Sequence, residues 1–116
     1  MPPSLLKRLP LYALSGILFL GAFSRFTHGV YTSAWYAYQE YHSPDDGSAV
    51  ARIILVIDAI AALLIAGPSR KPRLYAAGFA LVMFSIGLVM QVSAGKEYLG
   101  DVAHVAVAGA AVWGAL

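Results

Sequence analysis

Long apolar segments without charge are the feature that most constrains this chain. Residues 11–24 carry no charged side chain, and residues 74–92 carry none either. A bilayer is crossed by about 20 predominantly apolar residues in a helix, whereas a buried strand takes only about 4–8. We therefore expect the chain to fold as membrane-spanning helices.

Four segments of this kind are present in the 116 residues. They predict helices at about residues 11–30, 49–67, 74–92 and 101–116. The expected fold is all-α: a transmembrane four-helix bundle that forms a single integral membrane domain over residues 1–116, with a short inner loop and a longer, aromatic-rich outer loop. Charged residues make up only 12% of the chain, about half of the roughly 25% found in soluble domains. This composition favours a lipid environment.

The first apolar segment has a second interpretation. Lys7 and Arg8 followed by an apolar run are also typical of a signal peptide. However, "GAF" at residues 21–23 is a poor small-x-small cleavage site, and the helical pattern continues past it. A retained first helix is the favoured interpretation.

The cations predict how the helices are oriented. Lys7 and Arg8 precede the first segment, and the loop at residues 68–73 contains three more cations. With four spans both groups lie on the same side, which the positive-inside rule makes cytoplasmic. We therefore expect a multi-pass membrane protein whose N-terminus and 68–73 loop are cytoplasmic. The opposite loops contain most of the acidic residues: Glu40, Asp45, Asp46, Glu97 and Asp101.

Ionisable side chains interrupt the expected helices, mostly in their outer halves. A charge near the bilayer centre costs about 3 kcal/mol on insertion scales, so it normally faces protein or a water-filled cavity. These side chains share helix faces with glycine and alanine, which allow helices to approach closely. We expect them to converge in one polar pocket and to form the catalytic group: Arg25, His28, Asp58, Asp101 and His104.

Residues 30–42 are rich in aromatic side chains, with Trp35 and tyrosines at positions 31, 36, 38 and 41. Such clusters are typical of the membrane interface. The segment either continues the first helix or forms a short amphipathic element across the bundle. It either anchors the chain among headgroups or covers a ligand pocket. The expected substrate-binding residues are Trp35, Tyr31, Tyr38, Gln91 and Arg52.

Three of the expected catalytic residues also have a purely structural interpretation. Arg25 and Asp58 can form an ion pair that fixes helix packing, as buried pairs do elsewhere. His104 lies three residues after Asp101 and can be an oriented histidine at the start of a helix. The sequence leaves the choice between catalytic and structural roles open.

The chain resembles the DoxX-like family of small four-helix integral membrane proteins. The resemblance rests on chain size, on "GILFLGAFSRF" in the first helix with a cation near its outer end, and on the long first outer loop. It also rests on "RIILVIDAIAALLI" as the second helix and on a short, alanine-rich fourth helix. Some members of that family resemble quinone-linked oxidoreductase subunits. The resemblance implies the architecture and assigns no active-site residue.

Acid/base chemistry on a hydrophobic small molecule is the function expected from the polar pocket. Asp58 and His104, with Asp101 steadying the imidazole, would exchange protons with the substrate. Arg25 and His28 would stabilise developing negative charge. Isomerisation, cyclisation and epoxide opening need no cofactor, and the sequence contains no cofactor motif. We expect no cofactor and no metal site.

Two other functions stay open: a non-catalytic subunit of a quinone-linked membrane redox complex, and a small proton or solute transporter with Asp58 as the titrating group. The expected partners are a hydrophobic small-molecule substrate, the lipid bilayer, and either further copies of the chain or a membrane partner subunit. The lack of cysteine excludes disulfides and thiolate-held metals. A net charge of +2 without a basic groove argues against nucleic acid.

Overall fold

The computed structural model describes residues 3–42 and 47–116, with side chains described for residues 5–41 and 47–116. These residues fold into five helices and contain no strand, which confirms the all-α prediction. The helices are α1 (Pro3–Phe26), α2 (Ser33–His42), α3 (Ala49–Ala66), α4 (Arg70–Ser93) and α5 (Leu99–Ala115).

Three of the helices are long and apolar enough to cross a membrane. The candidate spans are Leu5–Phe26, Ala49–Ala66 and Arg70–Ser93. Only 22% of the apolar window in the second and in the third of them is buried inside the protein. Helices that are hydrophobic on most of their circumference need an apolar surrounding on their outer faces. These helices therefore indicate a membrane protein.

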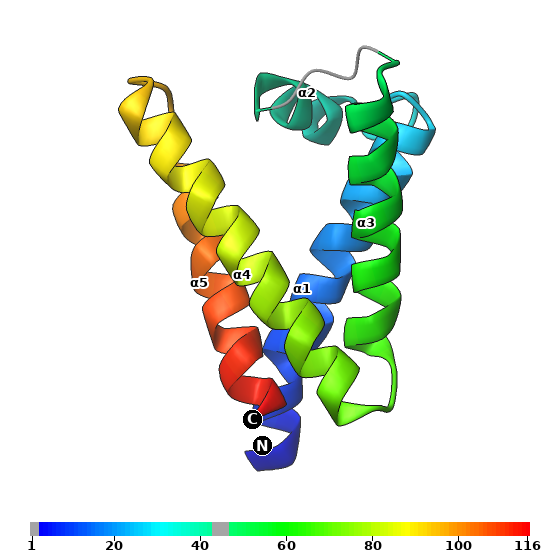
Figure 1. Ribbon diagram of the computed structural model, residues 1–116, viewed down its shortest axis with the longest axis vertical. Helices are drawn as coiled ribbons and strands as arrows, with labels where there is room; N and C mark the ends of the chain where they lie inside the picture. The colour runs from blue at the N-terminus through cyan, green and yellow to red at the C-terminus, as the bar shows by residue number, and fades with distance from the viewer. Residues whose placement is uncertain (1–2, 43–46) are drawn as a thin grey trace.

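The helices form two pairs that diverge from a common base (Figure 1). α1 packs along α3, and α4 packs along α5. The pairs meet where α1 contacts α5 and where the short turn joins α3 to α4, close to both termini. α2 lies across the opposite, open end (Figure 1). We call the two ends the converging end and the open end.

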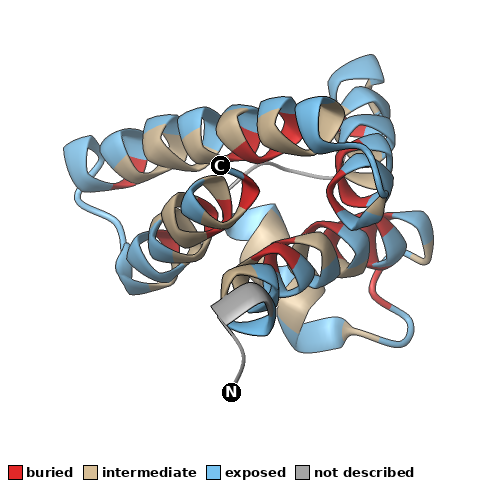
Figure 2. Ribbon diagram, turned by 90° about the horizontal axis from the view of Figure 1, so that it is seen from below, coloured by how far each residue is buried: buried red, intermediate tan, exposed pale blue. Residues whose placement is uncertain are grey.

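The core lies between the helices toward the converging end, and buried residues line the inner faces in Figure 2. It combines a few large side chains with many alanines: Leu11, Leu14, Leu18, Ala61, Ala62, Ile65, Ala76, Ala77, Ala80, Ala108, Ala111 and Ala115. Alanine lets helix backbones approach closely. The closest approach is at Gly114, where an added Cβ would collide with the backbone oxygen of Lys7. Glycine is therefore required where α5 crosses α1.

The first helix differs from its expected span of residues 11–30 at both ends. α1 starts at Pro3 and ends at Phe26, because His28 (φ 51°) and Gly29 (φ 76°) adopt left-handed backbone conformations. The Gly29 amide then donates to the Ser24 carbonyl, which closes the helix end. α2 is consequently a separate helix across the bundle, and the continuous-helix alternative for residues 30–42 is wrong.

The remaining helix bounds agree with expectation to within a few residues. Ser48 caps α3, with its hydroxyl accepting a hydrogen bond from the Ala51 amide at 3.3 Å. Asp45 and Asp46 lie outside the described residues. The α3–α4 turn is held by Arg73 Nη2, which donates to the Gly67 carbonyl at 2.5 Å.

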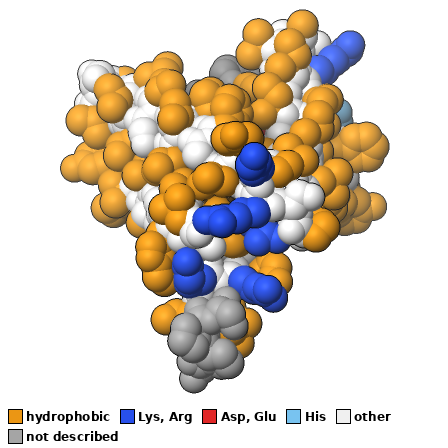
Figure 3. All heavy atoms as spheres, turned by 60° about the horizontal axis from the view of Figure 1, so that its bottom comes forward, with side chains coloured by type: hydrophobic (Ala, Val, Ile, Leu, Met, Phe, Trp, Pro, Cys, Tyr) orange, Lys and Arg blue, Asp and Glu red, His pale blue; other side chains and the backbone are white. Residues whose placement is uncertain are grey.

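Cations gather at the converging end (Figure 3). Lysine and arginine side chains spread over this face, and no Asp or Glu side chain is visible on its described part. The cations carried by the N-terminal segment and the α3–α4 turn are Lys7, Arg8, Arg70, Lys71 and Arg73. Arg70 Nη2 donates to the Leu116 carbonyl at 2.5 Å, and Lys7 Nζ lies 5.5 Å from the Trp113 ring centroid. The two basic segments therefore share one end of the molecule.

Candidate functional site

A cavity of about 290 Å³ fills the open end between the two helix pairs. All five helices contribute to its wall, and most of that wall is apolar. Its charged and hydrogen-bonding side chains are Arg25, Trp35, Tyr38, Gln39, Asp58, Asp101 and His104. A mostly apolar hollow with a few convergent polar groups is the usual form of a small-molecule site.

Asp58 and Gln39 lie against the backbone of α1 at Gly21. A Cβ on Gly21 would be 3.3 Å from Asp58 Oδ2 and 3.0 Å from Gln39 Nε2. Gln39 Nε2 donates to the Gly21 carbonyl at 3.1 Å. Gly21 thus brings α2 and α3 side chains to the same point on α1, because it has no side chain of its own.

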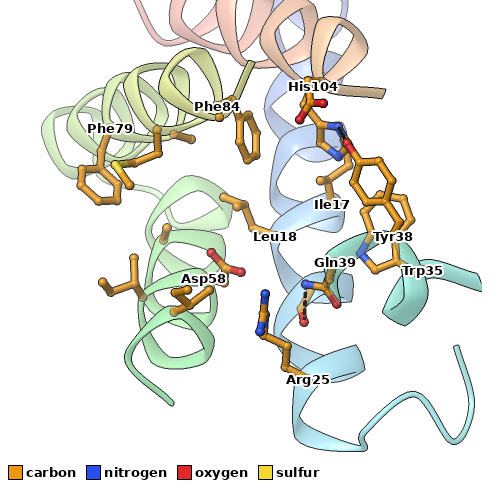
Figure 4. Close-up of a pocket in the computed structure, with 18 residues that line it drawn as sticks. Ile17, Leu18, Arg25, Trp35, Tyr38, Gln39, Asp58, Phe79, Phe84 and His104 are labelled. Atoms are coloured by element: carbon orange, nitrogen blue, oxygen red, sulfur yellow. Dashed lines mark hydrogen bonds between the residues drawn. The ribbon is translucent and has the colours of Figure 1, made fainter. Parts of the chain in front are cut away.

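Arg25 lies one turn after Gly21 on α1 and is only 5% exposed. Its guanidinium is directed toward the Asp58 carboxylate in Figure 4, and the two opposite charges attract. Arg25 and Asp58 both line the cavity. The first charged wall of the cavity is therefore a cation and a carboxylate contributed by α1 and α3.

His104 forms the second polar wall together with Tyr38. His104 Nδ1 lies 2.6 Å from the Gly100 carbonyl oxygen and 3.3 Å from the Tyr38 hydroxyl. Because a carbonyl oxygen can only accept, Nδ1 carries the hydrogen in this arrangement. The neutral imidazole then has its lone pair at Nε2, which makes Nε2 the atom that can take up a proton.

Aromatic rings surround the His104 imidazole. Its centroid lies 5.6 Å from Tyr38, 5.6 Å from Trp35 and 5.1 Å from Phe84. The Tyr38 ring is stacked at 16°, and the Phe84 ring is edge-on at 69°. α2 therefore fixes the position of the imidazole from one side and α4 from the other.

Tyr38 connects His104 with Asp101. Burial, the charge of Asp101 and a hydrogen bond to its carboxylate together raise the pKa of Tyr38 to about 12. Tyr38 is therefore a neutral hydrogen-bond donor at physiological pH. The sequence predicted a direct effect of Asp101 on His104, whereas in the structure His104 bonds to Gly100 and Tyr38 lies between the two groups.

The structure brings six of the ten predicted site residues to the cavity: Arg25, Trp35, Tyr38, Asp58, Asp101 and His104. The other four do not line it. His28 and Tyr31 are exposed, because α1 ends before them and the helical register on which they were placed stops. Arg52 is exposed on another side of α3, and Gln91 is buried one turn beyond the cavity-lining Gly87 of α4.

Sequence reasoning missed Gln39 and the apolar wall. Gln39 lies four residues after Trp35 on α2, a spacing that puts the two side chains on one helix face, so its position carried the signal. Phe79, Met83 and Phe84 of α4 complete the wall opposite α3. Their spacing along the uncharged segment 74–92 gave no indication that they face a cavity rather than lipid.

Among the described residues, no group of three or more His, Asp or Glu side chains is placed to hold a metal ion. Comparisons with known protein families, with curated proteins and with solved structures gave no match for this chain.

Proposed function

We propose that this protein is an integral membrane enzyme that binds a hydrophobic small molecule in the open-end cavity and converts it by acid/base chemistry. The observation that carries the proposal is the pairing of two polar walls in one apolar cavity. Arg25 and Asp58 form one wall, and Tyr38, Asp101 and His104 form the other. Packing alone does not require two separate titratable walls with a ligand-sized space between them.

The roles follow from the hydrogen bonds and charges. Asp58 beside Arg25 acts as a carboxylate base that removes a proton from the substrate. His104, held by Gly100 and stacked on Tyr38, delivers a proton from Nε2 in its imidazolium form. In an isomerisation one proton leaves one carbon and another reaches a second carbon, so the product has the same formula. The proton then returns from Asp58 to His104 through solvent.

Arg25 has a second role in this scheme. It stabilises negative charge that develops on the substrate while the proton is absent. In cyclisation and epoxide opening His104 is again the acid and Asp58 the base. His104 protonates the alkene or the epoxide oxygen, and Asp58 accepts the proton that the substrate loses. None of these reactions needs a redox group.

Four membrane-spanning helices are part of the proposal. α5 has 17 residues, or about 25 Å at 1.5 Å per residue, and its packing along α4 and α1 supports its placement as a short fourth span. The cations at the converging end support an orientation in which the N-terminus and the 68–73 loop are cytoplasmic. This topology and the resemblance to the DoxX-like family support one another.

Conversion of a membrane lipid extract tests the function. The purified protein in nanodiscs is incubated with the apolar extract of membranes from a strain that lacks it, and products are compared by mass spectrometry. We expect a product whose rate of formation falls by a factor of about 10² or more with Asp58→Asn and with His104→Asn, the usual effect of losing a general acid or base. Arg52→Gln is the matched control, because Arg52 lies on α3 outside the cavity.

Equal product from wild type and Asp58→Asn contradicts the enzymatic role. A small molecule that copurifies with wild type and with both variants, without conversion, instead supports a binding role for the same cavity. The helical circular dichroism of each variant shows whether the fold is retained.

A further inference from the structure

α2 presents two buried hydrogen-bonding atoms without a partner in the described part of the chain. They are Trp35 Nε1 and Gln39 Oε1. The two residues lie one turn apart on the same face of α2, and both line the cavity (Figure 4). Because buried polar atoms are almost always hydrogen-bonded, these two atoms point to a ligand that supplies the missing partners.

The orientation of the Gln39 amide is fixed by its neighbour. Its nitrogen lies 3.1 Å from the Gly21 carbonyl oxygen, which can only accept a hydrogen bond. The NH₂ group must therefore face Gly21, and Oε1 is left as an acceptor. A ligand group that meets Gln39 has to donate a hydrogen.

Trp35 imposes the opposite requirement. The indole Nε1–H is a donor and has no acceptor lone pair. A ligand group that meets Trp35 has to accept a hydrogen. A hydroxyl group does both at once, because its hydrogen can go to Gln39 and its lone pair can receive the hydrogen of Trp35. An ether or carbonyl supplies only the acceptor.

The rest of the cavity requires an apolar body. Apart from its polar side chains, the cavity is lined by apolar residues of α1, α3 and α4, among them Ile57, Phe79 and Met83. These three are 39%, 46% and 48% exposed, so the cavity wall continues onto the outer faces of the candidate spans. The ligand's hydrocarbon part therefore lies between α3 and α4 and can reach the cavity from lipid.

We propose that the ligand is a lipophilic alcohol whose hydroxyl bridges Trp35 and Gln39 while its hydrocarbon chain lies between α3 and α4. The inference rests on the proposed function in that it takes the cavity as the ligand site, and it adds the chemical class of that ligand. A cavity of about 290 Å³ holds on the order of ten water-sized groups at about 30 Å³ each. A chain of about ten carbons is thus a suitable probe.

Three probes that share a ten-carbon chain separate the two hydrogen bonds. Decan-1-ol can donate and accept, 1-methoxydecane can only accept, and decane can do neither. Native mass spectrometry of the protein in nanodiscs measures which probe is bound when two compete. We expect wild type to prefer the alcohol over the ether by about fivefold, the usual effect of one net hydrogen bond, and the ether over decane by a similar factor.

The variants assign each preference to its residue. Gln39→Met removes the acceptor, so we expect the alcohol-to-ether ratio to fall to about one. Trp35→Phe removes the indole donor and keeps an aromatic ring, so the ether should lose its advantage over decane, while the alcohol keeps an advantage of about fivefold over both other probes. Gln91→Met is the matched control, because Gln91 is a buried glutamine outside the cavity. It should leave all ratios unchanged.

Equal binding of alcohol and ether by wild type overturns the proposal, as does an unchanged ratio in Gln39→Met. These outcomes leave the proposed function intact if lipid conversion still depends on Asp58. If wild type prefers the alcohol but no lipid conversion depends on Asp58, the proposed function is wrong and the ligand proposal stands: the cavity recognises the alcohol but does not convert it.

Discussion

The two ends of this bundle are held together in different ways. At the converging end, alanines and Gly114 allow the backbones of α1 and α5 to meet with almost no side chain between them. At the open end, the same helices are separated by a cavity, and the contacts are made by long polar and aromatic side chains from α2. Close packing at one end provides the stability, so the other end can hold groups that do not stabilise the fold.

Changing Gly114 to alanine should break the converging end and have the largest effect. The added methyl collides with the Lys7 backbone oxygen, which cannot rotate away as a side chain could. We expect a loss of at least about 3 kcal/mol, the upper part of the range for overpacked cores. Thermal unfolding followed by circular dichroism in detergent measures it.

Gly109→Ala is the matched control on the same helix, because an added Cβ there meets nothing within 4 Å. Alanine is the better helix former by about 0.5–1 kcal/mol, so this variant should unfold at the same or a higher temperature. Equal destabilisation by both variants would show that the close α1–α5 crossing is not what holds the base together.

Removing one member of the Arg25–Asp58 pair should destabilise the open end less. A fully buried pair that loses one partner costs about 3–5 kcal/mol, and we expect about 2 kcal/mol for Arg25→Met because Asp58 is only half-buried. The double variant Arg25→Met/Asp58→Leu should regain most of the loss, since no uncompensated charge is left. A double-mutant cycle from unfolding midpoints gives the coupling; additive losses would exclude a structural ion pair.

Gly100→Ala should disturb the site while changing stability by about 1 kcal/mol or less, within the range of ordinary single substitutions. Its Cβ would lie 2.8 Å from the Tyr38 ring and hydroxyl, which can rotate away. Tyr38 then leaves His104, and binding of decan-1-ol should weaken. Gly78→Ala, which meets nothing within 4 Å and does not line the cavity, is the comparison variant. Unaltered binding in Gly100→Ala would show that the Tyr38 position does not matter to the ligand.

The effect that needs the most extreme condition is the pH dependence contributed by Tyr38, which appears only at alkaline pH. Its folded pKa of about 12 lies above the ordinary value of 10.0. A raised pKa contributes stability that is fully present below pH 10 and is lost as the pH rises toward 12. The difference in unfolding midpoint between wild type and Tyr38→Phe should therefore be constant up to about pH 10 and decrease above it. A difference that grows over that range would contradict the Tyr38–Asp101 contact.

Local sequence patterns predicted the elements better than the site. Long apolar runs located α3, α4 and α5 to within a few residues, because helix propensity and burial act locally. The end of α1 was missed since it depends on a left-handed conformation at His28, a residue that rarely adopts one. For the same reason the prediction that His28 and Tyr31 line the pocket was wrong.

The sequence correctly predicted cavity residues that are ionisable and stand in apolar segments, such as Arg25, Asp58 and His104. A charge in such a segment is unfavourable unless it faces protein or water, so these residues were recognisable. Gln39 was missed because an amide beside a glutamate and two tyrosines looks like an exposed surface. Its role depends on the distance between α2 and Gly21, which tertiary packing alone determines.

Every helix supplies part of the cavity wall. A guest in that space therefore bridges both pairs of helices, and by thermodynamic linkage a guest present at 100 times its dissociation constant adds about 2.7 kcal/mol to the unfolding free energy. Heat resistance thus becomes a reporter of occupancy: compound libraries can be ranked by the melting temperature they confer, before any reaction has been identified.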